Sequence, residues 1–185
     1  SLGVIALLTI LVVDPGLIAE RNRRIHTDQP IWDKVLFRLY GTMIGLVIPV
    51  LAGFDLRYTE QPGIPAWGQW IGATGYTLGW VISLWAMAVN KFFAQVVRIQ
   101  KDRGQQVVDA GPYRVIRHPG YAGGIVMTIS TPVLLGSGWA LTAGFLAGLL
   151  LLIRTALEDR VLQEELGGYR EYAERVPYRL VPGIW

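Results

Sequence analysis

The side chains best suited to chemistry lie in one short segment, residues 109–121, which reads Asp-Ala-Gly-Pro-Tyr-Arg-Val-Ile-Arg-His-Pro-Gly-Tyr. It holds two Arg, two Tyr and His118, one of only two histidines in the chain. A guanidinium binds carboxylates, and an aromatic face attracts cations. The 33 residues that follow, 122–154, carry no charge until Arg154. A charged segment beside a long apolar run predicts a ligand site at a membrane surface.

A second set of ionisable side chains follows that run. Arg154 and Glu158 are four residues apart, so a helix places them on one face, one turn apart. They could form an ordinary surface pair or anchor the helix at the interface. Pro119 could likewise be a first-turn helix proline, and Tyr121 an interface aromatic. As a set beside Glu158, however, these residues favour a ligand site.

Composition excludes several classes of protein. Hydrophobic residues make up 52% of the 185 residues and charged residues only 17%, whereas soluble domains carry about 25% charged residues. The net charge of +3 comes without a basic, aromatic-interleaved stripe, so nucleic acid is not an expected partner. With no cysteine and two distant histidines, a metal cluster is not expected. No Rossmann glycine motif or Walker loop is present.

The elements that must position the site are apolar helices. The sequence predicts an all-α, polytopic membrane helical bundle of about five transmembrane helices, ending in an interfacial amphipathic helix. Glycines at every third or fourth position predict two close helix contacts, at Gly41 and Gly45 and at Gly72, Gly75 and Gly79. The chain is expected to form one domain, in which residues 91–185 carry the cofactor-binding and catalytic part. The apolar segments are residues 2–13, 35–54, 70–90, 121–135 and 139–153, of which the first is short and is taken as the end of a helix.

Basic residues predict the orientation. Of 17 Lys and Arg, all but Arg57 lie in residues 14–38, 91–120 and 154–185. These three segments follow the first, third and fifth apolar segments, so a chain that crosses the membrane at each segment has all three on the same side. That side is cytoplasmic by the positive-inside rule. We therefore expect an integral membrane protein, of a cell inner membrane or an endomembrane, with its site facing the cytoplasm.

At these residues the sequence resembles the isoprenylcysteine carboxyl methyltransferase family of integral membrane enzymes. The resemblance covers about the last 90 residues, and it departs from the family where Glu158-Asp159 replaces a pair of glutamates. The first 90 residues match only as hydrophobic spans. The matching pieces are Gly111-Pro112-Tyr113, Arg117-His118-Pro119-Gly120-Tyr121 with Gly123, Arg154 with Glu158-Asp159 and Leu162, Leu166-Gly167, Tyr169, Tyr172 and Val176.

The resemblance implies S-adenosylmethionine as methyl donor and, as acceptor, a lipophilic small molecule or a prenylated molecule held near membrane lipid. Arg154 would face the acceptor, and Arg154, Glu158 and His118 would be the catalytic residues. The residues implied to contact the donor are Gln100, Gln105, Gln106, Val107, Val108, Tyr113, His118, Pro119, Gly120, Tyr121 and Glu158.

Other activities stay open at this point. Carboxyl O-methylation needs no strong base, because a carboxylate is already a nucleophile. N-methylation of a phospholipid amine would need one, and His118 or Glu158 could serve. Related membrane folds also include nicotinamide-dependent reductases. A non-enzymatic scaffold or transporter subunit fits the glycine faces equally well, and the sequence specifies no oligomeric state.

Overall fold

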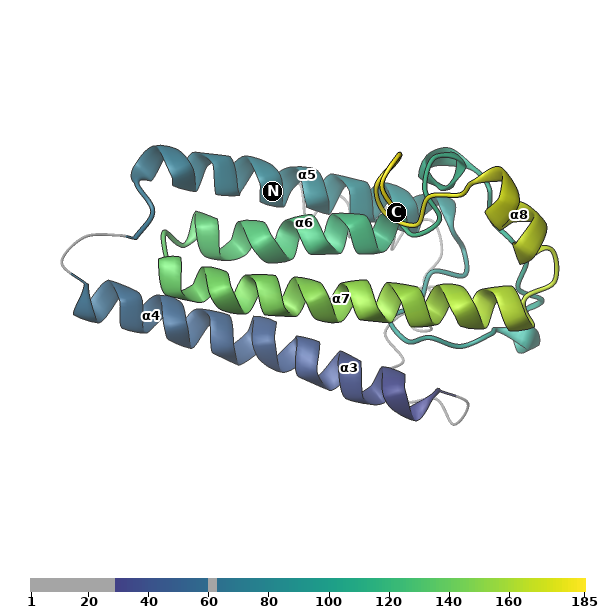
Figure 1. Cartoon of the computed structure of the whole chain (residues 1–185), viewed down its shortest axis with the longest axis horizontal. Coiled ribbons are helices and arrows are strands. Elements are labelled where there is room, and N and C mark those ends of the chain that lie inside the picture. Colours follow the sequence, from purple (N-terminus) through teal and green to yellow (C-terminus); the bar gives the residue numbers. More distant parts are fainter. Residues whose placement is uncertain (1–28, 60–62) are drawn as a thin grey trace.

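A computed structural model of the chain describes residues 29–59 and 63–185, which are helical or loop without a strand (Figure 1). The apolar segment 2–13 and the basic linker up to residue 28 lie outside the described residues. The elements in order are α3 (Ile31–Thr42), the π-helical turn η1 (Met43–Val47), α4 (Ile48–Tyr58), α5 (Ala66–Val89), the 3₁₀ turns η2 (Lys101–Arg103) and η3 (Gly111–Arg114), α6 (Pro119–Leu134), α7 (Gly138–Glu165) and α8 (Tyr169–Arg175).

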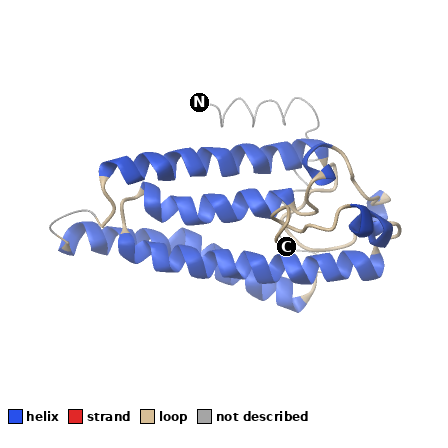
Figure 2. Ribbon diagram, turned by 45° about the horizontal axis from the view of Figure 1, so that its top comes forward, coloured by secondary structure: helices blue, strands red, loops and turns tan. Residues whose placement is uncertain are grey.

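The long helices lie side by side as an elongated bundle (Figures 1 and 2). Three helical stretches in the described residues are long and apolar enough to cross a membrane, namely Ile31–Tyr58, Ala66–Val89 and Gly138–Glu165. The prediction of an all-α membrane bundle is therefore confirmed. Of the five apolar segments expected, three correspond to these stretches. A fourth is α6, which has only 16 residues, and the first is not described.

Glycines bring α5 and α6 into close contact, as the spacing of Gly72, Gly75 and Gly79 predicts. A Cβ added at Gly72 would lie 2.4 Å from the backbone nitrogen of Leu134. One at Gly79 would lie 2.6 Å from the carbonyl oxygen of Gly123. Any larger residue would force the helices apart. At Gly41 and Gly45, in contrast, no described atom lies within 4 Å of such a Cβ, so a contact there stays a prediction.

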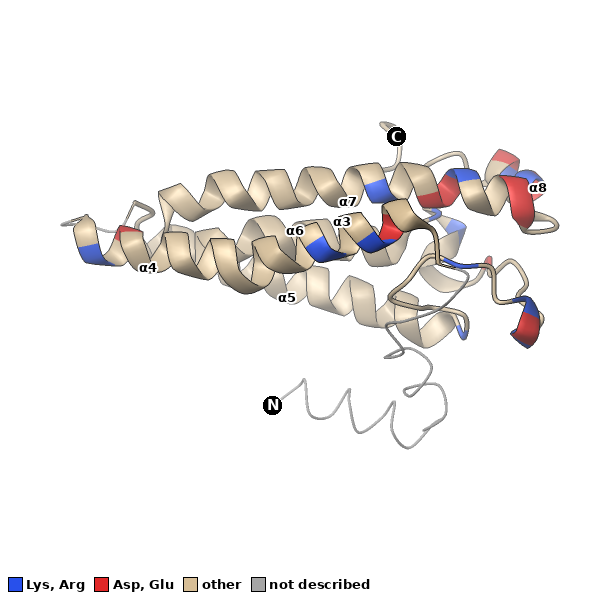
Figure 3. Cartoon of the chain, turned by 90° about the horizontal axis from the view of Figure 1, so that it is seen from below, with Lys and Arg blue, Asp and Glu red and all other residues tan. Residues whose placement is uncertain are grey.

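Charged side chains gather at one end of the bundle, around α8 and the loops of residues 90–118 (Figure 3). The expected surface helix is not found there as a separate element. Instead, α7 continues unbroken to Glu165, and α8 has only seven residues. The apolar side chains Tyr169, Tyr172 and Val176 pack with Leu166 against Val107 of the loop. This part of the prediction was wrong because the loop, and not the membrane, covers the apolar face.

Candidate functional site

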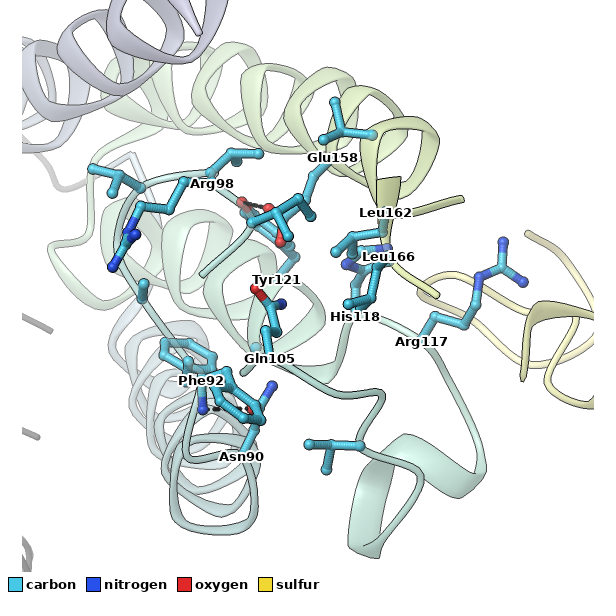
Figure 4. A pocket seen from close by; sticks show the side chains of 18 of the residues that line it. Asn90, Phe92, Arg98, Gln105, Arg117, His118, Tyr121, Glu158, Leu162 and Leu166 are labelled. Atoms are coloured by element: carbon cyan, nitrogen blue, oxygen red, sulfur yellow. Dashed lines mark hydrogen bonds between the residues drawn. The ribbon is translucent and has the colours of Figure 1, made fainter. Parts of the chain in front are cut away.

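A cavity of about 280 Å³ opens at the charged end of the bundle, between the loop of residues 90–108, the start of α6, and the facing sides of α3 and α7 (Figure 4). Pro119 does not line it. This proline is buried at the first position of α6, the helix-starting role that its position predicted. All other predicted site residues line the cavity, namely Gln100, Gln105, Gln106, Val107, Val108, Tyr113, His118, Gly120, Tyr121, Arg154 and Glu158.

Glu158 projects from α7 into this cavity and is half-buried. The hydroxyl of Tyr121, on α6, donates a hydrogen bond of 2.5 Å to its Oε2 atom (Figure 4). Within residues 29–59 and 63–185, no hydrogen bond reaches the other carboxylate oxygen. Glu158 is therefore oriented by Tyr121 and keeps one oxygen for a ligand.

Arg154 lies one turn earlier on α7, but it does not pair with Glu158 in the described structure. Its Nε donates to Asp33 Oδ1 at 2.7 Å, and its Nη2 donates to the carbonyl oxygen of Gln95 at 2.5 Å. The guanidinium carbon lies 5.5 Å and 5.6 Å from the ring centroids of Phe37 and Tyr121. The reading of Arg154 and Glu158 as an ordinary surface pair is therefore wrong.

Asp33 was missed by sequence reasoning, although it is fully buried beside the cavity. It lies at the start of α3, next to the apolar segment predicted from residue 35. An ionisable residue at the edge of a membrane span is costly unless it has a partner or a function. That cost is the signal that could have identified it, although not the identity of its partner.

Asp159, the neighbour of Glu158, does not line the cavity and is fully buried. It accepts hydrogen bonds from Arg117 Nε at 2.8 Å, Tyr169 Oη at 3.0 Å and Arg179 Nε at 2.9 Å. His118 Nε2 lies 3.1 Å from the same carboxylate. Asp159 thus joins the Arg117-His118 segment to the C-terminal tail, and it fixes His118 in the cavity wall.

The tail completes this arrangement from the other side. The backbone N–H groups of Arg117 and His118 donate to the carbonyl oxygens of Tyr178 and Arg179, each at 2.9 Å. Burial by itself lowers the pKa of Arg117, but the hydrogen bonds and charge of Asp159 outweigh it, so the pKa is raised. Burial and the nearby Asp159 carboxylate raise the pKa of Tyr169 well above its usual range. Both groups therefore hold their protons at neutral pH.

Glutamines shape the loop wall. Gln100 donates through Nε2 to the carbonyl oxygen of Phe92 at 2.6 Å, and its Oε1 accepts from Arg103 at 2.6 Å. The Oε1 atom of Gln105 accepts from the backbone N–H of Gln100 at 2.7 Å. Both ends of the Gln100 side chain are thus used within the loop, so this residue supports the wall.

Comparisons with known proteins give relatives of this chain. Protein-S-isoprenylcysteine O-methyltransferase B of Arabidopsis thaliana is 27% identical over 114 residues, which are 60% of this chain and 58% of that protein. The protein-S-isoprenylcysteine O-methyltransferase of Dictyostelium discoideum is 29% identical over 123 residues, 62% of this chain and 49% of that protein. Delta(14)-sterol reductase TM7SF2 of Mus musculus is 30% identical over 93 residues, 44% of this chain and 20% of that protein.

The fold is also similar to that of a solved structure, the eukaryotic intramembrane Ras methyltransferase ICMT. That likeness has a TM-score of 0.69 at 22% sequence identity, and it covers 96% of this chain and 61% of that one. The chain therefore spans about half to three fifths of the methyltransferases that it matches, and a fifth of the sterol reductase. The model of the isoprenylcysteine carboxyl methyltransferase (ICMT) family matches residues 73–165, half of the chain, from α5 to the end of α7. The chain belongs to the isoprenylcysteine carboxyl methyltransferase family.

Proposed function

We propose that this protein is a membrane methyltransferase that binds S-adenosylmethionine in the cavity and methylates the carboxylate of a lipophilic, isoprenylcysteine-like acceptor. The proposal rests on which charged side chains of the cavity wall form ion pairs and which do not. Arg98 pairs with Asp102 at 2.9 Å, Arg117 with Asp159 at 2.8 Å, and Arg154 with Asp33 at 2.7 Å.

Glu158 forms no such ion pair with the described residues. It is the carboxylate that lines the cavity, and no cation pairs with it among the described residues. A carboxylate in a partly buried site is costly without a positive partner. The donor carries a sulfonium and an ammonium group, so its bound form supplies the missing positive charge. This match is the single observation that carries the proposal.

The remaining lining residues fit the rest of the donor. Tyr113 and Tyr121 offer aromatic faces, which attract a cation. Val107, Leu162 and Leu166 provide an apolar wall of the kind that suits a nucleoside base. In this proposal, the donor-contacting residues are those predicted from the sequence, except that Pro119 acts through the start of α6 and Gln100 through the loop.

The acceptor is assigned to the other side of Arg154. Phe37, Tyr40, Gly124 and Leu151 line the cavity there, from α3, α6 and α7, and they form an apolar surface beside the guanidinium. When bound, the donor supplies an activated methyl group, which a carboxylate oxygen can accept without a base. Arg154 holds that carboxylate by ionic hydrogen bonds, and the surrounding side chains exclude water. In this proposal the site faces the cytoplasm.

Titration of the purified protein with S-adenosylhomocysteine tests the donor site. We expect saturable binding to the wild type, and binding weaker by at least about tenfold in Glu158→Gln, because an ionic partner is lost. Folded protein that binds neither donor nor product would reject the proposal in favour of a non-enzymatic membrane protein.

Transfer of radiolabelled methyl groups tests the acceptor. We expect N-acetyl-S-farnesylcysteine to become labelled and phosphatidylethanolamine not to be labelled. The reverse pattern would indicate amine N-methylation.

A further inference from the structure

Asp33 connects three separate parts of the chain at the edge of the cavity. Its Oδ1 accepts a hydrogen bond from Arg154 Nε on α7 at 2.7 Å. Its Oδ2 accepts from the backbone N–H of Val97 in the loop at 2.9 Å and from Gln29 Nε2 before α3 at 2.6 Å. Both oxygens of a fully buried carboxylate are thus used, and the element that supplies it lies before the part of the chain that the family model matches.

These contacts fix the guanidinium of Arg154 in one orientation. Nε is held by Asp33 and Nη2 by the carbonyl oxygen of Gln95, while Phe37 and Tyr121 flank the group. A guanidinium is a rigid planar fork, so two bound nitrogens determine where the third lies. That third nitrogen, Nη1, has no hydrogen-bond partner in the parts of the chain that the structure describes.

The geometry points to Asp33 as a positioning residue for the methyl acceptor. It keeps Arg154 from pairing with Glu158, one turn away on the same helix, and leaves Nη1 to bind the acceptor's carboxylate. Glu158 in turn stays available to the donor. This inference rests on the proposed function for the identity of the ligands, whereas the hold of Asp33 on Arg154 can be measured without it.

The same membrane stretch offers a matched control. Asp55, near the end of α4, is also a buried carboxylate. It accepts hydrogen bonds from Ser137 at 2.7 Å and Thr59 at 2.7 Å, at the opposite end of the bundle, and it does not line the cavity. Asp55→Asn therefore removes the same chemical group without touching Arg154.

The first test compares kinetics of the full chain in detergent, using N-acetyl-S-farnesylcysteine as acceptor. We expect Asp33→Asn to raise the acceptor KM by at least about tenfold, while the dissociation constant of S-adenosylhomocysteine changes by less than about threefold. Asp55→Asn should leave both constants within about twofold. An unchanged acceptor KM, equal losses for donor and acceptor, or the same effect in Asp55→Asn would each overturn the inference.

The second test does not depend on activity. Phenylglyoxal labels exposed arginines, and peptide mass spectrometry gives the rate at Arg154. We expect labelling at least about tenfold faster in Asp33→Asn and unchanged in Asp55→Asn, because only the first releases the guanidinium. Equal rates would show that Asp33 does not hold Arg154, even if the wild type proves to bind no donor.

A third variant covers the case in which Asp33→Asn does not fold. Asp33→Glu keeps the negative charge but moves the carboxylate by one methylene. We expect folded protein with intact binding of S-adenosylhomocysteine and a raised acceptor KM. A wild-type acceptor KM in Asp33→Glu would refute a positioning role.

Discussion

Glu158 and Asp159 are adjacent in sequence, yet their replacement should have opposite consequences. Asp159→Asn removes the negative charge of a fully buried carboxylate, which accepts hydrogen bonds from Arg117, Tyr169 and Arg179. Breaking a buried ion pair by removing one partner costs about 3–5 kcal/mol. Glu158→Gln keeps an acceptor oxygen for Tyr121 and loses only the charge of a half-buried carboxylate. The expected cost is therefore the difference between a hydrogen bond to a charged group and one to a neutral group, about 0.5–1.5 kcal/mol.

These energies convert into measurable shifts of thermal unfolding. For a chain of this length, 1 kcal/mol shifts the midpoint by about 2–4 °C, so we expect falls of about 6–20 °C for Asp159→Asn and about 1–6 °C for Glu158→Gln. Binding of S-adenosylhomocysteine should show the reverse order when measured below both midpoints, since only Glu158 faces the ligand. The seven tryptophans allow unfolding to be followed by intrinsic fluorescence in one detergent.

Two outcomes would refute this reasoning. If Asp159→Asn unfolds within about 2 °C of the wild type, the network around Asp159 does not hold the charged end of the bundle together. If both variants lose stability equally and Glu158→Gln still binds S-adenosylhomocysteine, the two carboxylates do not divide their roles as the structure indicates.

Two further predictions concern packing and alkaline pH. Gly72→Ala should lower the unfolding midpoint by several degrees, because its Cβ would lie 2.4 Å from the backbone nitrogen of Leu134. Gly41→Ala should not, because no atom of the described residues lies within 4 Å of its Cβ. Equal shifts would contradict the packing. Burial raises the pKa of Tyr169 and Tyr172 above their ordinary value of 10.0, so the folded chain holds these protons more tightly than the unfolded chain. Stability should therefore be full below about pH 10 and fall above it. In a variant with both Tyr169→Phe and Tyr172→Phe, the midpoint of thermal unfolding should fall less steeply between about pH 9 and 11 than in the wild type. An equally steep fall would show that other groups cause the loss of stability.

Local patterns predicted those parts of the fold that depend on neighbours in sequence. Long apolar runs indicated the membrane helices, and the spacing of Gly72, Gly75 and Gly79 identified the face of α5 that meets α6. Pro119 marked the start of α6. The last apolar run ends at residue 153, whereas the helix continues past it, as the helical spacing of Arg154 and Glu158 implied. The residues after 153 are good helix formers without Gly or Pro, so α7 continues to Glu165.

The pairing of charges could not be read from sequence, because it depends on tertiary structure. Arg154 and Asp33 are 121 residues apart, and a partner one helical turn away, Glu158, was available in the sequence. Adjacent residues on a helix point about 100° apart, so Glu158 and Asp159 face different surroundings, one the cavity and the other the packed interior. The positions of Arg117 and the C-terminal tail, which bind Asp159, determine which of the two carboxylates lies in the cavity.

The length of α7 indicates how deep Arg154 and Glu158 lie in the membrane. The exposed side chains Trp67, Trp70 and Trp139 lie at the end of the bundle where the backbone N–H of Ile64 donates to the carbonyl oxygen of Gly136. Aromatic belts of this kind mark a membrane–water interface. From Trp139, a hydrocarbon core of about 30 Å takes up about 20 residues of helix. The opposite boundary then falls near Glu158, and Arg154 lies one turn inside it. A buried cation at that depth requires a buried anion, which Asp33 supplies. An acceptor with its lipid tail between the helices would present its polar group at the same depth. In the proposed function, the arginine for that acceptor therefore lies inside the membrane, and the carboxylate for a water-soluble donor lies at its edge.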